Sequence, residues 1–88
     1  MQRRSRLEIL LDVLDTINRK PMRPTRVMYR CNLSWKIVNE VLDIAVSQEL
    51  VSKEKAGNGF KYAITDKGRK VLEYSKFIRA NTSLVVSS

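Results

Sequence analysis

Residues 16–39 contain both prolines of the chain and no acidic side chain. A proline inside a helix removes a hydrogen bond and clashes with the preceding turn, so Pro21 and Pro24 indicate a turn between two short helices. The other 64 residues hold all nine acidic side chains. The segment carries six basic side chains: Arg19, Lys20, Arg23, Arg26, Arg30 and Lys36. Such a cluster weakens folding by self-repulsion unless a polyanion offsets it.

Length and composition indicate one small basic domain. Eighty-eight residues suit a single domain, and a hydrophobic content of 43% suits a packed core. The net charge of +8 fits a nucleic-acid partner or another anionic surface, and equally a solvated basic face. The position of the charge, at a turn between two helices, favours double-stranded DNA.

The composition disfavours other classes of protein. Cys31 is the only cysteine and there is no histidine, so neither an intrachain disulfide nor a metal site is expected. No phosphate-binding loop or nucleophile motif is present, and the neighbouring Asp12 and Asp15 form no catalytic group with a histidine, so we expect neither an enzyme nor a cofactor. No apolar run approaches the ~20 residues that span a bilayer, and we expect a cytoplasmic protein with no membrane partner.

The first helix is predicted at about residues 6–18. Ser5 and Glu8 have the spacing of a capping box just before an apolar run. The expected core positions recur at helical spacing: Leu7, Leu10, Leu11, Leu14 and Ile17.

Two further helices are predicted around a short turn. The second covers about residues 26–31, with Thr25 as its N-cap, and the third covers about 35–48, with Ser34 as its N-cap. Trp35 is expected to face out or lie at the border of the third helix, where packing is favoured over a base contact. Tyr29 is expected to pack with its hydroxyl at the edge. The third helix should turn four side chains inward: Val38, Val41, Leu42 and Ala45.

A β-hairpin and a last helix are predicted to follow. Residues 50–55 and 60–64 have strand character and flank the turn signal at 57–59. Residues 22–25 are expected to add a third strand stub. Thr65 should cap a helix at about 66–80, and residues 81–88, without helical period, are expected to be a flexible tail. Residues 1–80 then form a mainly α winged-helix domain with a small β-hairpin, because an isolated hairpin must pack on the helices.

Three motifs resemble an archaeal winged-helix family of small basic DNA-binding proteins and transcription regulators. They are Pro24-Thr25-Arg26-Val27-Met28-Tyr29, then Asn32-Leu33-Ser34-Trp35, then Tyr62-x-Ile64-Thr65-x-Lys67-Gly68, within residues 5–78. The resemblance implies an intracellular archaeal protein, often a homodimer joined through its last helix. Two features depart from the family. Glu49 stands where the family commonly has glycine, and the last helix is short for an extended coiled coil.

Four basic side chains are expected to contact DNA phosphates. Arg26 and Arg30 lie one turn apart on the outer face of the second helix, near the backbone that such a helix crosses. Lys55 and Lys61 flank the turn of the hairpin, as Lys53 also does. The other interpretation is a solvated arginine face and a charged strand edge that prevents aggregation.

Base recognition is expected from the start of the third helix. Lys36 can contact guanine acceptors, and Asn39 can contact adenine through two hydrogen bonds. Plain surface polarity explains them about equally well. Glu40 and Asp43 follow on the same side and would repel phosphates, so they either accept a hydrogen bond from cytosine or limit insertion to the first turn.

The two ends of the chain hold weaker candidates. Arg3, Arg4 and Arg6 suit either a flexible arm on DNA or a disordered basic tail. Three residues suggest a homodimer interface on the last helix, with Leu72 turned toward the domain's own core: Val71, Tyr74 and Ile78.

The sequence therefore favours double-stranded DNA binding as a transcription regulator or chromatin-type protein. The alternative is a winged-helix module for protein–protein interaction that does not bind DNA. A fold by itself does not decide between these functions.

Overall fold

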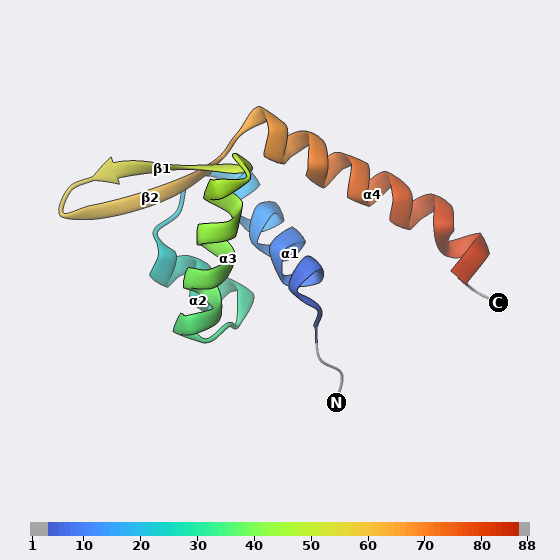
Figure 1. Cartoon of the computed structure of the whole chain (residues 1–88), viewed down its shortest axis with the longest axis horizontal. Coiled ribbons are helices and arrows are strands. Elements are labelled where there is room, and N and C mark those ends of the chain that lie inside the picture. Colours follow the sequence, from blue (N-terminus) through green and yellow to red (C-terminus); the bar gives the residue numbers. More distant parts are fainter. Residues whose placement is uncertain (1–3, 87–88) are drawn as a thin grey trace.

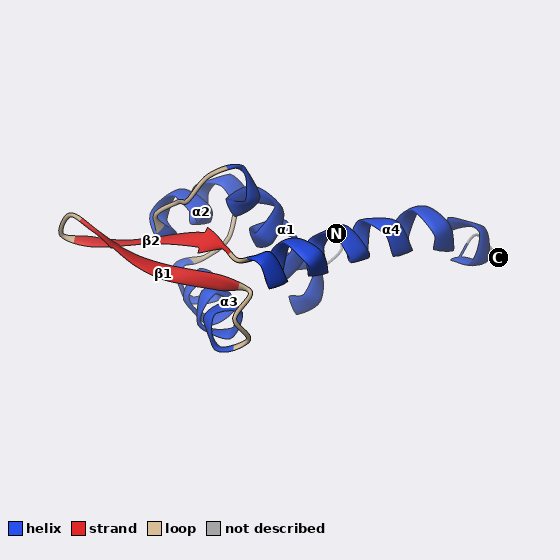
Figure 2. Cartoon of the chain, turned by 90° about the horizontal axis from the view of Figure 1, so that it is seen from above, coloured by secondary structure: helices blue, strands red, loops and turns tan. Residues whose placement is uncertain are grey.

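The computed structural model of this chain describes residues 4–86 and shows the predicted order of helix, helix, helix, hairpin and helix (Figure 1). The fold class is therefore confirmed as a winged helix. The elements are α1 (Arg6–Arg19), α2 (Pro24–Cys31), α3 (Trp35–Ser47), β1 (Val51–Ala56), β2 (Gly59–Ile64) and α4 (Asp66–Val86). The hairpin and α4 project from the three-helix core in opposite directions (Figures 1 and 2).

The first helix begins at the predicted capping box. The backbone N–H of Glu8 donates to Ser5 Oγ at 3.1 Å, and the N–H of Ser5 donates to Glu8 Oε1 at 2.9 Å. The predicted core face is too narrow, because α1 packs against α2, α3, α4 and β2 at once. Leu7 is 63% exposed, and the buried residues are Ile9, Leu11, Val13, Leu14 and Ile17.

The second helix starts earlier than predicted. Its N-cap is Arg23 and not Thr25, and Pro24 occupies the first helical position. Proline is favoured there because its fixed φ suits a helix and its missing N–H would have no partner in the helix. The helix ends at Asn32, which adopts the left-handed conformation with φ 54°.

The third helix matches its prediction. Ser34 is the N-cap, and its Oγ accepts a hydrogen bond of 3.2 Å from the N–H of Ile37. All four predicted inward side chains are buried: Val38, Val41, Leu42 and Ala45.

The hairpin is an antiparallel pair in which Val51 faces Ile64 and Ala56 faces Gly59. Its root is anchored by Tyr62, which is buried in the core. Met22 exchanges two backbone hydrogen bonds with Tyr62, of 3.0 and 2.8 Å, so the predicted third strand stub is a single bridge.

Glu49 adopts the left-handed conformation that glycine has in the resembling family. Its φ is 62°, and the N–H of the following Leu50 donates to the carbonyl oxygen of Ala45 at 2.8 Å. Thr65 Oγ1 donates to the carbonyl oxygen of Glu49 at 2.6 Å and accepts from the N–H of Gly68 at 3.0 Å. The end of α3 is thereby joined to the start of α4.

The last helix is longer than predicted. It continues to Val86, so the expectations of an end near residue 80 and of a tail without helical structure are wrong for residues 81–86. Residues 87–88 lie outside the described part. Leu72 is buried, as predicted, and Val71 packs half-buried against the same core. Within residues 4–86, no helix is both long and apolar enough to cross a membrane.

Candidate nucleic-acid interface

A basic hollow lies between the start of α2 and the hairpin. It has a volume of about 280 Å³, and none of its lining residues is acidic. Four basic side chains line it: Lys20, Arg23, Arg26 and Lys61. Sequence reasoning selected Arg26 and Lys61 separately, and the structure brings them together. Lys20 and Arg23 were not selected as site residues from the sequence. Both belong to the acid-free segment 16–39, whose charge already indicated a DNA-binding region.

Arg23, the N-cap residue of α2, is hydrogen-bonded to the hairpin. Its Nη2 donates a hydrogen bond of 3.0 Å to the carbonyl oxygen of Ala56, the last residue of β1. Its Nη1 lies 3.0 Å from the position that a Cβ on Gly59 would occupy. The guanidinium therefore lies close against the tip of the hairpin and adds positive charge there.

Arg30 lies apart from the basic hollow. It lines a separate depression of about 190 Å³ together with Arg19 and Asp15. Asp15 pairs with Lys76 at 3.1 Å, so this depression, unlike the basic hollow, contains a carboxylate. Arg26 and Arg30 thus border different hollows, although they lie one turn apart on the same helix.

Tyr29 does not pack as expected. It is 78% exposed, and it lies on the outer face of α2 between Arg26 and Arg30. The prediction failed because only Val27 and Cys31 are buried on this short helix, and Tyr29 lies off that stripe.

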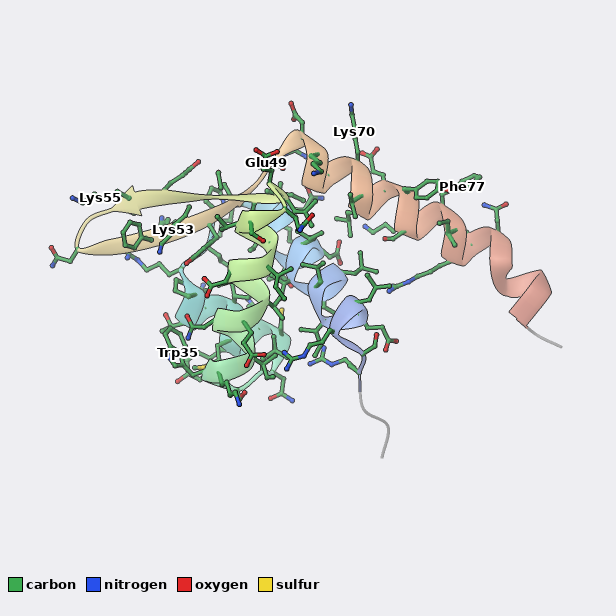
Figure 3. The ribbon with its side chains drawn as sticks, in the orientation of Figure 1. Trp35, Glu49, Lys53, Lys55, Lys70 and Phe77 are labelled. Carbon is green, nitrogen blue, oxygen red and sulfur yellow. The ribbon has the colours of Figure 1, made fainter. Side chains whose placement is uncertain are left out.

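The lysines of the hairpin lie on both of its faces. Lys55 faces Phe60 across the strands, whereas Lys61 faces Glu54. Because directly opposed residues point to the same side of a sheet, Lys55 and Lys61 point to opposite faces. Lys53 shares the face of Lys55, and its Nζ lies 4.4 Å from the centre of the Phe60 ring (Figure 3).

The start of α3 is exposed and free of acids. Trp35 is 49% exposed, so it lies at the border of the domain and packs over only part of its surface, and Lys36 beside it is exposed. Figure 3 shows Trp35 at the end of α3 that lies farthest from α4. Asn39 is half-buried, and its Nδ2 donates to the carbonyl oxygen of Trp35 at 2.9 Å.

The acidic residues of α3 differ in their surroundings. Glu40 pairs with Arg6 of α1 at 2.8 Å, which offsets the negative charge that was expected to repel phosphates. Asp43 is exposed and makes no ion pair among the side chains that the structure describes.

Two of the three arginines expected to form an arm are held by the domain. Arg6 makes the pair with Glu40, and Arg4 donates to Asp12 at 2.6 Å and to the carbonyl oxygen of Cys31 at 2.8 Å. A free arm is therefore the wrong description of Arg4 and Arg6, because acceptors of the folded core are within their reach. Arg3 lies outside the described residues.

Cys31 is a buried core residue. Burial raises the pKa of its thiol, and a 3.4 Å contact with Thr16 Oγ1 partly opposes that effect. The thiol therefore stays protonated at neutral pH and adds no charge to the interface.

An apolar strip runs along the exposed side of α4. Tyr74 and Phe77 are 66% and 63% exposed, and Ile78 is 38% exposed (Figure 3 labels Phe77). Ile78 also lines a hollow of about 440 Å³ with Leu7 and Leu11 of α1. Of the three residues expected at a dimer interface, Tyr74 and Ile78 lie on this strip, whereas Val71 packs partly against its own core.

Comparison with known families agrees with this geometry. A family model described as winged helix-turn-helix matches residues 3–82. The uncharacterised protein MJ0287 of Methanocaldococcus jannaschii is 29% identical over 69 residues, which cover 78% of this chain and 67% of that protein. A second protein of that organism, MJ0290, is 27% identical, and the match covers 32% of its length.

Three solved structures share the fold. The DNA-binding protein Sso10a-2 from Sulfolobus solfataricus superposes with a TM-score of 0.81 and 24% identity, over 96% of this chain and 88% of that one. The transcriptional regulator BldR from the same organism superposes with a TM-score of 0.77 and 16% identity, over 91% of this chain and 61% of that one. The homodimeric winged helix-turn-helix DNA-binding domain of Mb0332 from Mycobacterium bovis superposes with a TM-score of 0.73 and 14% identity, over 82% of this chain and 68% of that one.

Proposed function

Since this chain belongs to the winged helix-turn-helix family, we propose that it binds double-stranded DNA as a transcription regulator or chromatin-type protein. The observation that carries the proposal is the basic hollow between α2 and the hairpin. Four basic residues line it, and no acidic residue does. Like charges brought near one another repel, and a phosphate bound among them reduces that repulsion.

The proposed complex has α3 in the major groove and phosphate contacts on both sides of it. Arg26 and Lys61 contact one phosphate from the basic hollow. Arg30 contacts the backbone from the outer face of α2, and Lys55 does so from the hairpin. Phosphate contacts position the protein but carry no sequence information directly.

Base recognition is proposed for Lys36 and Asn39. Both lie in the first turns of α3, the end that meets base edges in helix-turn-helix proteins. The hydrogen bond from Asn39 to the carbonyl oxygen of Trp35 uses one amide N–H. The other N–H and Oδ1 remain for a two-bond contact with adenine.

Salt dependence tests the proposal. About four to six phosphate contacts per chain predict a slope of roughly −4 to −5 in a plot of log affinity against log salt concentration. Arg26→Ala should weaken binding to all duplexes and make the slope shallower by about 1. Lys70→Ala is the matched control, because it removes one positive charge from α4 (labelled in Figure 3), away from the basic hollow.

Absence of binding at low salt would favour the second candidate, a protein-interaction module. Asp43 favours that candidate, since an exposed carboxylate on α3 repels phosphates. Glu40 no longer supports it, because Arg6 offsets its charge.

A homodimer joined through α4 is also proposed. Support comes from the exposed strip of Tyr74, Phe77 and Ile78, and from the length of 21 residues that removes the earlier objection of a short helix. A dimer would place two winged helices on two half-sites, and linked binding would raise the affinity for DNA.

A further inference from the structure

Trp35 presents an apolar ring at the end of the helix that is proposed to enter the major groove. It is the first residue of α3 and is 49% exposed. Single apolar side chains are common on protein surfaces, so exposure alone indicates no function. The position of Trp35 does indicate a function, because the first residues of a recognition helix are those that meet base edges.

Asn39 links Trp35 to the proposed base contacts. The two residues are four apart and share a face of α3, and the amide of Asn39 is held on the carbonyl oxygen of Trp35 at 2.9 Å. Asparagine suits adenine, and the partner of adenine is thymine. The C5-methyl of thymine is the apolar group that a base pair presents in the major groove. An apolar ring beside an adenine contact can therefore pack against the C5-methyl group of the paired thymine.

We propose that Trp35 contacts the C5-methyl group of thymine in the major groove and gives the protein a preference for A·T pairs next to the Asn39 contact. This inference rests on the proposed binding of double-stranded DNA. The contact buries part of the indole and the methyl group together, which is favourable in proportion to the apolar area removed from water.

Stacking on unpaired bases is the competing use of an exposed aromatic ring. Proteins that bind single strands stack successive bases on several aromatic side chains along a basic groove. Trp35 is the only aromatic residue of α3. The ring of Phe60 on the hairpin is already covered on one side by the ammonium group of Lys53 at 4.4 Å. The arrangement therefore favours the duplex.

Uracil tests the proposal directly, since it is thymine without the methyl group. The affinity is measured at one salt concentration for mixed-sequence duplexes made with thymine and for the same duplexes made with uracil. The wild-type protein should bind the thymine duplexes about fourfold more tightly for each methyl group buried. Trp35→Ala should bind both alike. The matched control Tyr29→Ala removes a more exposed aromatic ring from α2 and should keep the preference.

A second measurement needs no variant, because Trp35 is the only tryptophan in the chain. Its fluorescence should shift to shorter wavelength on binding thymine duplexes, and less on binding uracil duplexes. Equal wild-type affinity for the two duplexes, or an undiminished preference in Trp35→Ala, would overturn the proposal. Equal emission with both duplexes and strong quenching by single strands would overturn it in favour of stacking. Failure of the wild type to bind any duplex would instead contradict the proposed function itself.

Discussion

Gly68 lies so close to the carbonyl oxygen of Leu50 that a Cβ at position 68 would overlap it. The same Cβ would lie 2.9 Å from Cγ1 of Ile64. The first turn of α4 therefore crosses the root of the hairpin at a distance that only glycine allows. This close approach sets the direction in which α4 leaves the domain (Figure 1).

Gly68→Ala should destabilise the protein by about 3 kcal/mol, because the overlapping atoms belong to the backbone and α4 must move as a whole. Helix propensity alone predicts the opposite, a gain of about 1 kcal/mol. Urea unfolding followed by circular dichroism measures the difference. Gly59→Ala is the control, and it should have a smaller effect because its Cβ meets only the movable end of Arg23. A stabilised Gly68→Ala protein would show that the crossing is looser than described.

Glu49→Gly should stabilise the protein by about 0.5–1 kcal/mol. The left-handed conformation costs a non-glycine residue about 1–2 kcal/mol, and the greater freedom of glycine in the unfolded chain removes part of the gain. Asn32 has the same conformation, but asparagine tolerates it well. The free energy of unfolding of Asn32→Gly should therefore rise less than that of Glu49→Gly. Equal gains at the two positions would contradict this explanation.

Acid should weaken the start of α1. The pKa of Glu8 is lowered by the hydrogen bond that it accepts from the backbone of Ser5, and further by its side-chain interaction with Ser5. A lowered folded-state pKa contributes stability that is present above the unfolded value, near 4.5, and is lost as pH falls through the folded value. The melting temperature of the wild type should fall more steeply below about pH 5 than that of Glu8→Gln, since glutamine keeps an acceptor but does not titrate. Parallel curves for the two proteins would argue against this linkage.

Tyr74→Ala should shift the proposed dimer toward monomer at micromolar concentration. The side chain is 66% exposed on α4 in the single chain, so its loss removes contact area from a partner and little from its own core. Sedimentation velocity measures the change. Tyr29→Ala is the control, because Tyr29 is exposed on α2 and lies away from α4. A wild-type protein that is monomeric throughout would remove the proposal and leave DNA binding by single domains.

The sequence by itself determined the local structure of the chain. The capping box at Ser5, the cap at Ser34, the inward stripe of α3 and the hairpin turn all depend on residues a few positions apart. Their hydrogen bonds and their hydrophobic periodicity can therefore be predicted without knowing the tertiary structure. The left-handed conformation of Glu49 was not decided by the sequence, because the resemblance showed only that the family commonly has glycine at this position.

Element ends were less predictable. Pro24 starts α2 because proline suits the first helical position, whereas Thr25 looked like the better cap. Residues 81–86 continue α4 although their composition is poor in helix formers. Extending an existing helix adds a hydrogen bond for each residue that is ordered, so weak local preference does not stop it.

Only the tertiary structure decided which residues come together in the candidate interface. The basic hollow joins Lys61 to Arg26 from 35 positions away, and Arg6 reaches Glu40 from a different helix. Whether an aromatic residue is buried also depends on distant neighbours. Sequence reasoning placed Tyr29 in the domain's packing, and the structure leaves it exposed. The neighbours of a side chain belong to elements that are far apart in the sequence. Local sequence patterns do not show which of these elements pack together.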